Sequence, residues 1–167
     1  MNNATSSTRA VSLTVQELAH SSLLDMSVLP SYRALLEELA LVDGLSAPAL
    51  LETEELLIGE LRVGLMCDGD AHNGDILVYT SLGRPAPERE PDIDRLLLEA
   101  NHLGVGTAGC ILGRHSLTGV VTLCARAPIP LTQAASLSDL LQAFYGVASL
   151  WRDEIERKHR PDPRKMS

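Results

Sequence analysis

Three glycines in the stretch LGVGTAGC, Gly104, Gly106 and Gly109, have the G-x-G-x-x-G spacing of a dinucleotide-binding turn. Such a turn binds a pyrophosphate only when a strand precedes the glycines and a helix follows them. The surrounding sequence predicts the opposite order, with a helix over residues 91–103 and a strand near residues 107–113. A helix C-terminus carries a partial negative charge, which repels phosphate. The spacing therefore indicates a helix stop and a flexible connection to a strand, and it argues against a nucleotide cofactor.

Two further stretches have the residue types of metal sites. The segment CDGDAHNGD, residues 67–75, is rich in oxygen ligands, but a calcium loop needs glycine at its sixth position and glutamate at its twelfth. Counted from Asp68, these positions hold Asn73 and Tyr79. A Cys-x4-His spacing also occurs in two places, Cys67 with His72 and Cys110 with His115. Structural zinc sites use shorter, paired spacings, so we predict a hairpin turn, buried thiols and no metal site.

The sequence contains no arrangement that predicts a catalytic centre. Ser81 lies in TSLG and not in the G-x-S-x-G turn that presents a nucleophilic serine. Glu37 and Glu38 are adjacent, so on a helix they point about 100° apart and do not form a carboxylate pair. We therefore expect a protein without enzymatic activity. The alternative is a small α/β ligand-binding domain or enzyme that uses His102 and the Gly104–Gly109 corner.

The spacing of apolar residues predicts three helices in the chain. Residues 31–44 have apolar side chains at helical spacing, with Ser31 able to cap the start and Gly44 just past the end. Residues 91–103 form a second amphipathic stripe, which Gly104 is expected to terminate. A long third helix is expected over residues 137–155.

Strand-like runs lie between these helices. ELRVGLMC (60–67) and DILVYTSL (75–82) are joined by a segment of turn residues and predict a hairpin. A shorter strand is predicted at residues 49–51, and two more are predicted near residues 107–113 and 119–126. The resulting order is α-β-β-β-α-β-β-α. It predicts an α+β fold in which helices pack against a small, antiparallel, twisted sheet.

Composition and charge narrow the class of protein. The chain has 167 residues, 45% of them hydrophobic, which suits one domain with a sizeable core. The net charge of −8 and the 3% aromatic content argue against a nucleic-acid partner. No apolar run approaches the roughly 18 residues of a membrane span, and the N-terminus lacks the pattern of a signal peptide. Three cysteines without a disulfide framework suit a reducing compartment, so we expect a cytoplasmic protein without membrane insertion.

The chain divides into three regions. Residues 1–30 form an N-terminal extension that we expect to be partly disordered, residues 31–158 form the domain, and residues 159–167 form a basic tail. Within the domain, the helix at 91–103 has leucines on more than one face. A second copy of the protein would bury this excess, and a wide stripe within one monomer explains it equally well.

Several segments together resemble the class I type III secretion chaperones of the CesT/Tir-chaperone family. They are LVYTSLG, a proline-rich loop, LLLEANHLGVGTAGCILG, TGVVTLCARAPI and a final helix that ends SLWRDEIE. The resemblance runs from about Tyr32 to Glu156. Its most specific part is LLEAN followed by the glycine-rich turn and a strand that ends in Leu-Gly, and the terminal Trp-Arg is a second landmark.

The resemblance implies a secretion-chaperone-like fold and an acidic homodimer without enzymatic activity. Such a chaperone binds an extended segment near the N-terminus of a type III secretion effector and keeps the effector export-competent. The export ATPase is a further candidate partner. The residues implied for the dimer interface are Leu96, Leu97, Leu98, Asn101 and Leu103. Those suggested for effector binding are Tyr32, Leu35, Leu36, Leu61 and Val63, and each of these is equally a candidate for the core.

Overall fold

The computed structural model describes residues 31–157, so the predicted N-terminal extension and basic tail lie outside the described residues. The helices of the described chain are α2 (Tyr32–Asp43), α3 (Ala47–Thr53), α4 (Glu90–Asn101) and α5 (Ala134–Glu156). The strands are β1 (Glu55–Ile58), β2 (Leu61–Asp68), β3 (Asp75–Gly83), β4 (Ile111–Arg114) and β5 (Val121–Pro128). Short 3-10 turns precede α4, follow it and follow β5, at Pro87–Arg89, His102–Gly104 and Ile129–Leu131.

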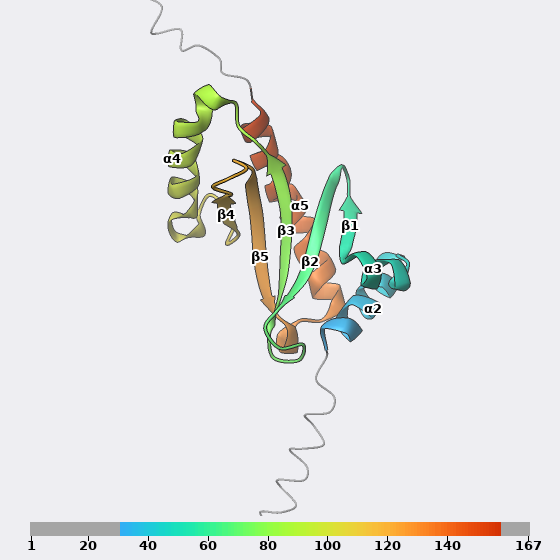
Figure 1. Ribbon diagram of the computed structural model, residues 1–167. Helices are drawn as coiled ribbons and strands as arrows, with labels where there is room; N and C mark the ends of the chain where they lie inside the picture. The colour runs from blue at the N-terminus through green and yellow to red at the C-terminus, as the bar shows by residue number, and fades with distance from the viewer. Residues whose placement is uncertain (1–30, 158–167) are drawn as a thin grey trace, which may run out of the picture.

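The five strands form one antiparallel sheet in the order β1-β2-β3-β5-β4 (Figure 1). β3 is central, because it pairs with β2 through Leu65↔Val78 and with β5 through Val78↔Ala125. β1 and β4 are the two edges of the sheet. The predicted α+β class and the antiparallel sheet are confirmed.

Helix α5 lies across one face of this sheet (Figure 1). Its buried side chains recur every three or four residues, which is the spacing of one helix face: Leu137, Leu141, Phe144, Ala148, Trp151 and Ile155. The strands alternate, and their inward side chains, such as Val63, Val78 and Leu123, are completely buried. Hydrophobic burial between these two layers forms the core.

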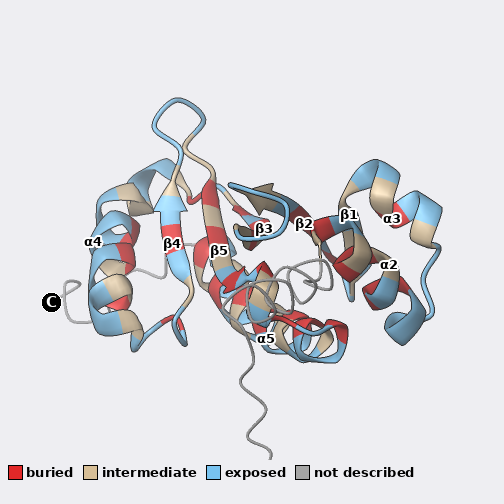
Figure 2. Ribbon diagram, turned by 90° about the horizontal axis from the view of Figure 1, so that it is seen from below, coloured by how far each residue is buried: buried red, intermediate tan, exposed pale blue. Residues whose placement is uncertain are grey.

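No helix of the described chain covers the opposite face of the sheet. Figure 2 shows α5 beneath the sheet, α4 beside the β4 edge, and α2 and α3 beside the β1 edge. The outward side chains of Met66, Tyr79 and Ile111 are exposed on the uncovered face. The fold therefore leaves a partly apolar sheet face accessible to solvent.

The short strand predicted at residues 49–51 is wrong, because these residues belong to α3. The Ser46 side chain accepts a hydrogen bond from the Ala49 N–H, and Pro48 occupies the first turn, so both helix-start signals are present. The first strand is β1, which begins just after Glu54 ends the helix with a φ of 50°. A short apolar run does not distinguish a helix turn from a strand, and the capping residues decide the structure here.

The predicted boundaries on either side of the glycine-rich turn also shift. α4 ends at Asn101 and not at residue 103, because Leu103 and Gly104 adopt φ angles of 56° and 67°. β4 begins at Ile111, since the Cys110 N–H donates to the Thr107 carbonyl and closes a turn before the strand. The long C-terminal helix and the hairpin of β2 and β3 are confirmed, with small changes at their ends.

We predict that Phe144→Ala lowers the free energy of unfolding by about 3–5 kcal/mol, because it leaves a cavity between α5 and the sheet. Urea unfolding followed by circular dichroism measures this change. Gln142→Ala, at an exposed position of the same helix, is the control and should change stability very little. Equal effects of the two substitutions would contradict the assignment of the core.

Candidate functional site

Asn101, the last residue of α4, joins this helix to an edge of the sheet. Its Nδ2 donates to the Leu112 carbonyl at 2.8 Å, and its Oδ1 accepts from the Leu112 N–H at 2.9 Å. In an antiparallel ladder, both backbone groups of alternate residues point to the same neighbour. The bond from the His115 N–H to the Val120 carbonyl fixes this alternation. The backbone groups of Ile111 therefore point toward β5, and those of Leu112 point outward from the sheet edge. Asn101 thus satisfies the edge groups that another strand would otherwise pair.

Two arginines hold the rest of α4 in place. Arg114 of β4 contacts Glu90 at 2.6 Å and Asp94 at 2.9 Å, and these carboxylates raise its pKa. Arg89 donates to the backbone carbonyl of Glu154 at 2.7 Å and pairs with the carboxylate of the same residue at 2.7 Å. A cation at this position also interacts favourably with the C-terminal end of α5. α4, the turn and β4 together form one fixed unit, called here the α4 platform.

The glycine-rich turn uses its backbone N–H groups within the protein. The Gly106 N–H donates to the Ala100 carbonyl at 3.2 Å, and the Gly109 N–H donates to the Gly104 carbonyl at 3.1 Å. The Trp151 indole donates to the Gly106 carbonyl at 3.1 Å, which holds the turn against α5. A Cβ at Gly106 would lie only 2.9 Å from the Cβ of Ala100, so this position needs glycine. With its N–H groups engaged in this way, the turn connects elements and does not form a phosphate cradle.

The α4 platform presents apolar side chains to solvent. Leu98 is 74% exposed, and it lies on the same helix stripe as Asp94 and Asn101, which both bond to β4. Three more exposed apolar residues follow from the end of the helix into β4: Leu103, Val105 and Ile111. Four exposed apolar residues on one fixed unit are a candidate protein interface.

The five residues predicted for a dimer interface have different environments. Leu98 and Leu103 are exposed, Leu97 is buried in the core, and Leu96 is half-buried against it. Asn101 bonds within its own chain. Consecutive helical residues point about 100° apart, so Leu97 faces the core while Leu98 faces solvent. The sequence interpretation also missed Val105, which no periodic pattern marks, and Ile111, which strand alternation could have indicated.

The five residues suggested for effector binding lie in the core. They are Tyr32, Leu35, Leu36, Leu61 and Val63, and each is less than 10% exposed. None of these five side chains is exposed in this structure. The physical reason is that the apolar stripe that identifies a helix or strand in a sequence is the stripe that the core buries. The exposed neighbours of these residues are therefore the accessible candidates for a binding surface at this end of the molecule.

Such neighbours occur at the end of α2 and on β1. Leu41, Val42 and Leu45 are exposed where α2 turns into α3, and Leu57 of β1 is 70% exposed. A groove of about 260 Å³ at the β1 edge is lined by Thr53, Glu55, Leu56, Leu57 and Arg62. The β1 end of the sheet therefore combines exposed apolar side chains with a concave surface.

The backbone of β1 is open at one residue. The Leu65 N–H donates to the Glu54 carbonyl, so the backbone groups of Leu56, two residues further on, also point toward β2. Because backbone groups alternate along a strand, the N–H and carbonyl of Leu57 point outward. The Thr53 hydroxyl lies 3.3 Å from both the N–H and the carbonyl of Glu55, the other outward residue. Among the described residues, Leu57 has no hydrogen-bond partner for its outward groups, in contrast to Leu112 at the other edge.

The geometry does not favour catalysis by the cysteines or His102. Burial raises the pKa of the Cys67, Cys110 and Cys124 thiols, which keeps them protonated near neutral pH and weakly nucleophilic. His102 is exposed at the end of α4. Within residues 31–157, no group of three His, Cys, Asp or Glu side chains is placed to hold a metal ion.

None of the helices between residues 31 and 157 combines the length and the apolar character needed to cross a membrane.

The model of the Tir chaperone protein (CesT) family matches residues 34–152, from α2 through most of α5. The match includes the whole sheet, the α4 platform and the glycine-rich turn. The chain belongs to the Tir chaperone family.

Three solved structures share the fold of this Tir chaperone family member. The HopA1–SchA chaperone–effector complex has a TM-score of 0.58 at 17% identity, over 73% of this chain and 93% of that one. The ExsC–ExsE complex has a TM-score of 0.59 at 22% identity, over 74% and 92%. The ExoT–SpcS complex from Pseudomonas aeruginosa has a TM-score of 0.53 at 24% identity, over 71% and 95%. No sequence among the curated proteins matches the chain.

We predict that Asn101→Ala lowers the free energy of unfolding by about 1–3 kcal/mol, because it leaves two buried backbone groups of Leu112 without partners. Urea unfolding measures the loss, and hydrogen exchange at the Leu112 amide should become faster. Glu99→Ala, at an exposed position of the same helix, is the control. Unchanged protection of the Leu112 amide in Asn101→Ala would show that the side chain does not close this edge.

Proposed function

We propose that this member of the Tir chaperone family is a homodimeric cytoplasmic chaperone for type III secretion effectors. It binds an extended segment near the N-terminus of an effector and keeps that effector export-competent. Family membership supports the proposal, as does the shared fold with HopA1–SchA, a chaperone–effector complex. The observation that carries it is the difference between the two sheet edges: Asn101 closes β4, whereas Leu57 leaves β1 open.

An open sheet edge suits an extended ligand. A peptide that pairs with β1 gains main-chain hydrogen bonds at Leu57, and its alternate side chains can contact the exposed sheet face. Main-chain pairing does not depend on ligand sequence, so apolar contacts have to fix the register. The exposed residues at the end of α2 and the groove beside Leu57 provide such contacts.

Holding an unfolded segment also requires a large contact surface. A segment that becomes ordered on binding loses conformational entropy, and a single short edge does not offset that loss. The apolar end of α2, the β1 edge and the part of the uncovered sheet face around Met66 and Tyr79 together offer such a surface. A second protomer would double this surface.

The α4 platform is the surface that we assign to the homodimer. Leu98, Leu103, Val105 and Ile111 are apolar and exposed, and the hydrogen bonds and ion pairs of α4 hold them in fixed positions. A two-fold interface would bury the same residues from both protomers. Docking of the loaded chaperone to the export ATPase stays an expectation from the family resemblance.

The proposed function is tested by purification of the tagged protein from its native bacterium under secreting conditions. We expect secreted effectors to co-purify, with a segment near the effector N-terminus protected from limited proteolysis. Mass spectrometry identifies both the effectors and the protected segments. Recovery of the protein alone, or only with metabolic enzymes, would contradict the proposal.

Leu57→Pro tests the pairing at β1. Proline removes the outward N–H of residue 57 without removing a bond to β2, so we expect an intact fold and about tenfold weaker effector binding. Isothermal titration with the effector segment identified by co-purification measures the affinity.

Leu57→Ala is the matched control, because it removes the side chain and keeps the N–H. If both variants weaken binding equally, the side chain and not main-chain pairing carries the affinity at this edge. If neither variant weakens binding, the effector does not use the β1 edge.

Leu98→Asp and Leu103→Asp test the dimer. Each places a charge on an exposed apolar position of the α4 platform, so we expect the dimer to dissociate to the 18.0 kDa chain without loss of fold. Size-exclusion chromatography with light scattering measures the mass. Leu117→Asp, at an exposed position of the β4–β5 turn outside the platform, is the control. A dimer that persists in both platform variants would contradict this assignment.

A further inference from the structure

The sheet opens between β2 and β3 at the end nearest the C-terminus of α5. The ladder pairs these strands from Asp68↔Asp75 to Val63↔Thr80, but β2 begins at Leu61 and β3 continues to Gly83. Beyond Thr80, β3 no longer pairs with β2. It continues to pair with β5, with an irregularity between Ser81 and Gly83. The two strands separate, and α5 side chains become accessible through the gap.

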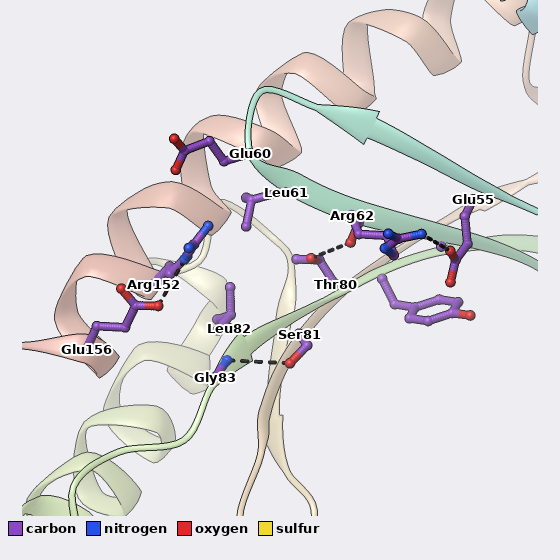
Figure 3. Close-up of a pocket in the computed structure, with 12 residues that line it drawn as sticks. Glu55, Glu60, Leu61, Arg62, Thr80, Ser81, Leu82, Gly83, Arg152 and Glu156 are labelled. Carbon is purple, nitrogen blue, oxygen red and sulfur yellow. Dashed lines mark hydrogen bonds and ion pairs between the residues drawn. The ribbon is translucent and has the colours of Figure 1, made fainter.

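This gap is a groove of about 440 Å³, shown in Figure 3. One end holds the ion pair of Arg152 and Glu156 from α5, and the other end holds the pair of Arg62 and Glu55. Glu60, in the turn between β1 and β2, lies at the rim. We call this depression the hairpin groove.

The hairpin groove is continuous with two neighbouring depressions. It shares Glu55 and Arg62 with the groove beside Leu57 at the β1 edge. It shares Glu60 and Arg152 with a further depression of about 260 Å³ on the flank of α5. One concave surface therefore runs from the proposed effector edge, across the β1–β2 hairpin, to α5.

Two glycine–tyrosine contacts shape this surface. A Cβ on Gly64 would lie 2.3 Å from the Tyr79 ring, and a Cβ on Gly59 would lie 2.4 Å from the Tyr145 hydroxyl. The absence of side chains at both glycines lets the two tyrosine side chains approach the hairpin closely. Tyrosine rings attract cations over their faces and present apolar surface to a neighbouring chain. Tyr79 lines the hairpin groove and Tyr145 lines the depression on α5.

Negative charge exceeds positive charge along this surface. The two arginines are each paired with a glutamate at 3.0 Å, while Glu60 and Asp153 make no ion pair among residues 31–157. Glu156 raises the pKa of Arg152 through a hydrogen bond and its charge, and the charges of Glu60 and Asp153 add smaller effects in the same direction. In the hairpin groove itself, a cationic side chain would meet Glu60, which makes no ion pair among residues 31–157, and the Tyr79 ring.

We propose that the hairpin groove binds an arginine or lysine side chain of the extended effector segment, with Glu60 as its main partner. This inference rests on the proposed function and specifies the chemistry of the ligand. A strand paired at Leu57 could continue along the shared wall of Glu55 and Arg62 into the groove. The basic residue would then fix the register that main-chain pairing leaves open.

Charge-swapped peptides test the proposal. Two synthetic peptides of about ten residues, ~33 Å when extended, share an alternating Val/Thr frame and differ only in a central Arg or Glu. Isothermal titration against the wild-type protein should show the Arg peptide binding about tenfold more tightly than the Glu peptide. In ¹⁵N-labelled protein, the Arg peptide should shift the amide resonances of Gly59, Gly64 and Gly83.

Glu60→Arg should reverse the preference, so that the Glu peptide binds more tightly. Asp139→Arg, an equal charge change at an exposed position near the start of α5, should leave the preference unchanged. Equal binding of the two peptides to the wild-type protein, no binding of either, or an unchanged preference in Glu60→Arg would each overturn the proposal. Co-purification of effectors with the wild-type protein is scored separately, so a failed groove and a failed chaperone function give different results.

Discussion

The fold depends on the packing of one long helix against one face of the sheet. α5 has 23 residues and therefore a length of about 35 Å. Its buried stripe covers the inward-facing side chains of the sheet. This packing leaves the other face of the sheet without a helix over it in the described chain. Since the core lies on one face of the sheet only, local contacts or partners have to cover the apolar side chains of the other face and bond the free backbone groups of the two edges. The candidate surfaces follow from this constraint.

The outward backbone groups of the two edge strands have different hydrogen-bond partners. At β4, the amide of Asn101 uses one N–H donor and its carbonyl oxygen at the spacing of a backbone residue, so a single side chain pairs with Leu112 as a neighbouring strand would. At β1, the Thr53 hydroxyl accepts from the Glu55 N–H, but the outward groups of Leu57 stay open. Exposed edges promote non-specific association, so proteins usually protect them. An edge that is protected at one outward-facing residue and open two residues further on is suited to pairing with a short extended segment.

The sequence predicts the long elements well, because their apolar residues recur at the spacing of the face that is buried in the core. α5 and the hairpin of β2 and β3 are examples. The short α3 could not be separated from a strand by pattern, since its apolar residues are too few to show a period. The exposed residues of the proposed dimer surface are harder still to predict. Leu97 and Leu98 are identical in type and adjacent, and only the direction of α4 relative to the sheet decides which one is exposed. For the same reason, the residues suggested for ligand binding were the most regular apolar ones and became core.

The positions of the proposed surfaces have a consequence for assembly. The α4 platform lies beside β4 and the open edge is β1, so the strand order places them at opposite ends of the sheet, about 19 Å apart at 4.8 Å per strand. A dimer formed through α4 would leave both β1 edges free and would hold them on the outer sides of the assembly. An extended chain could follow the surface from one edge to the other. The same geometry that separates dimer formation from ligand binding therefore favours an unfolded ligand over a folded one.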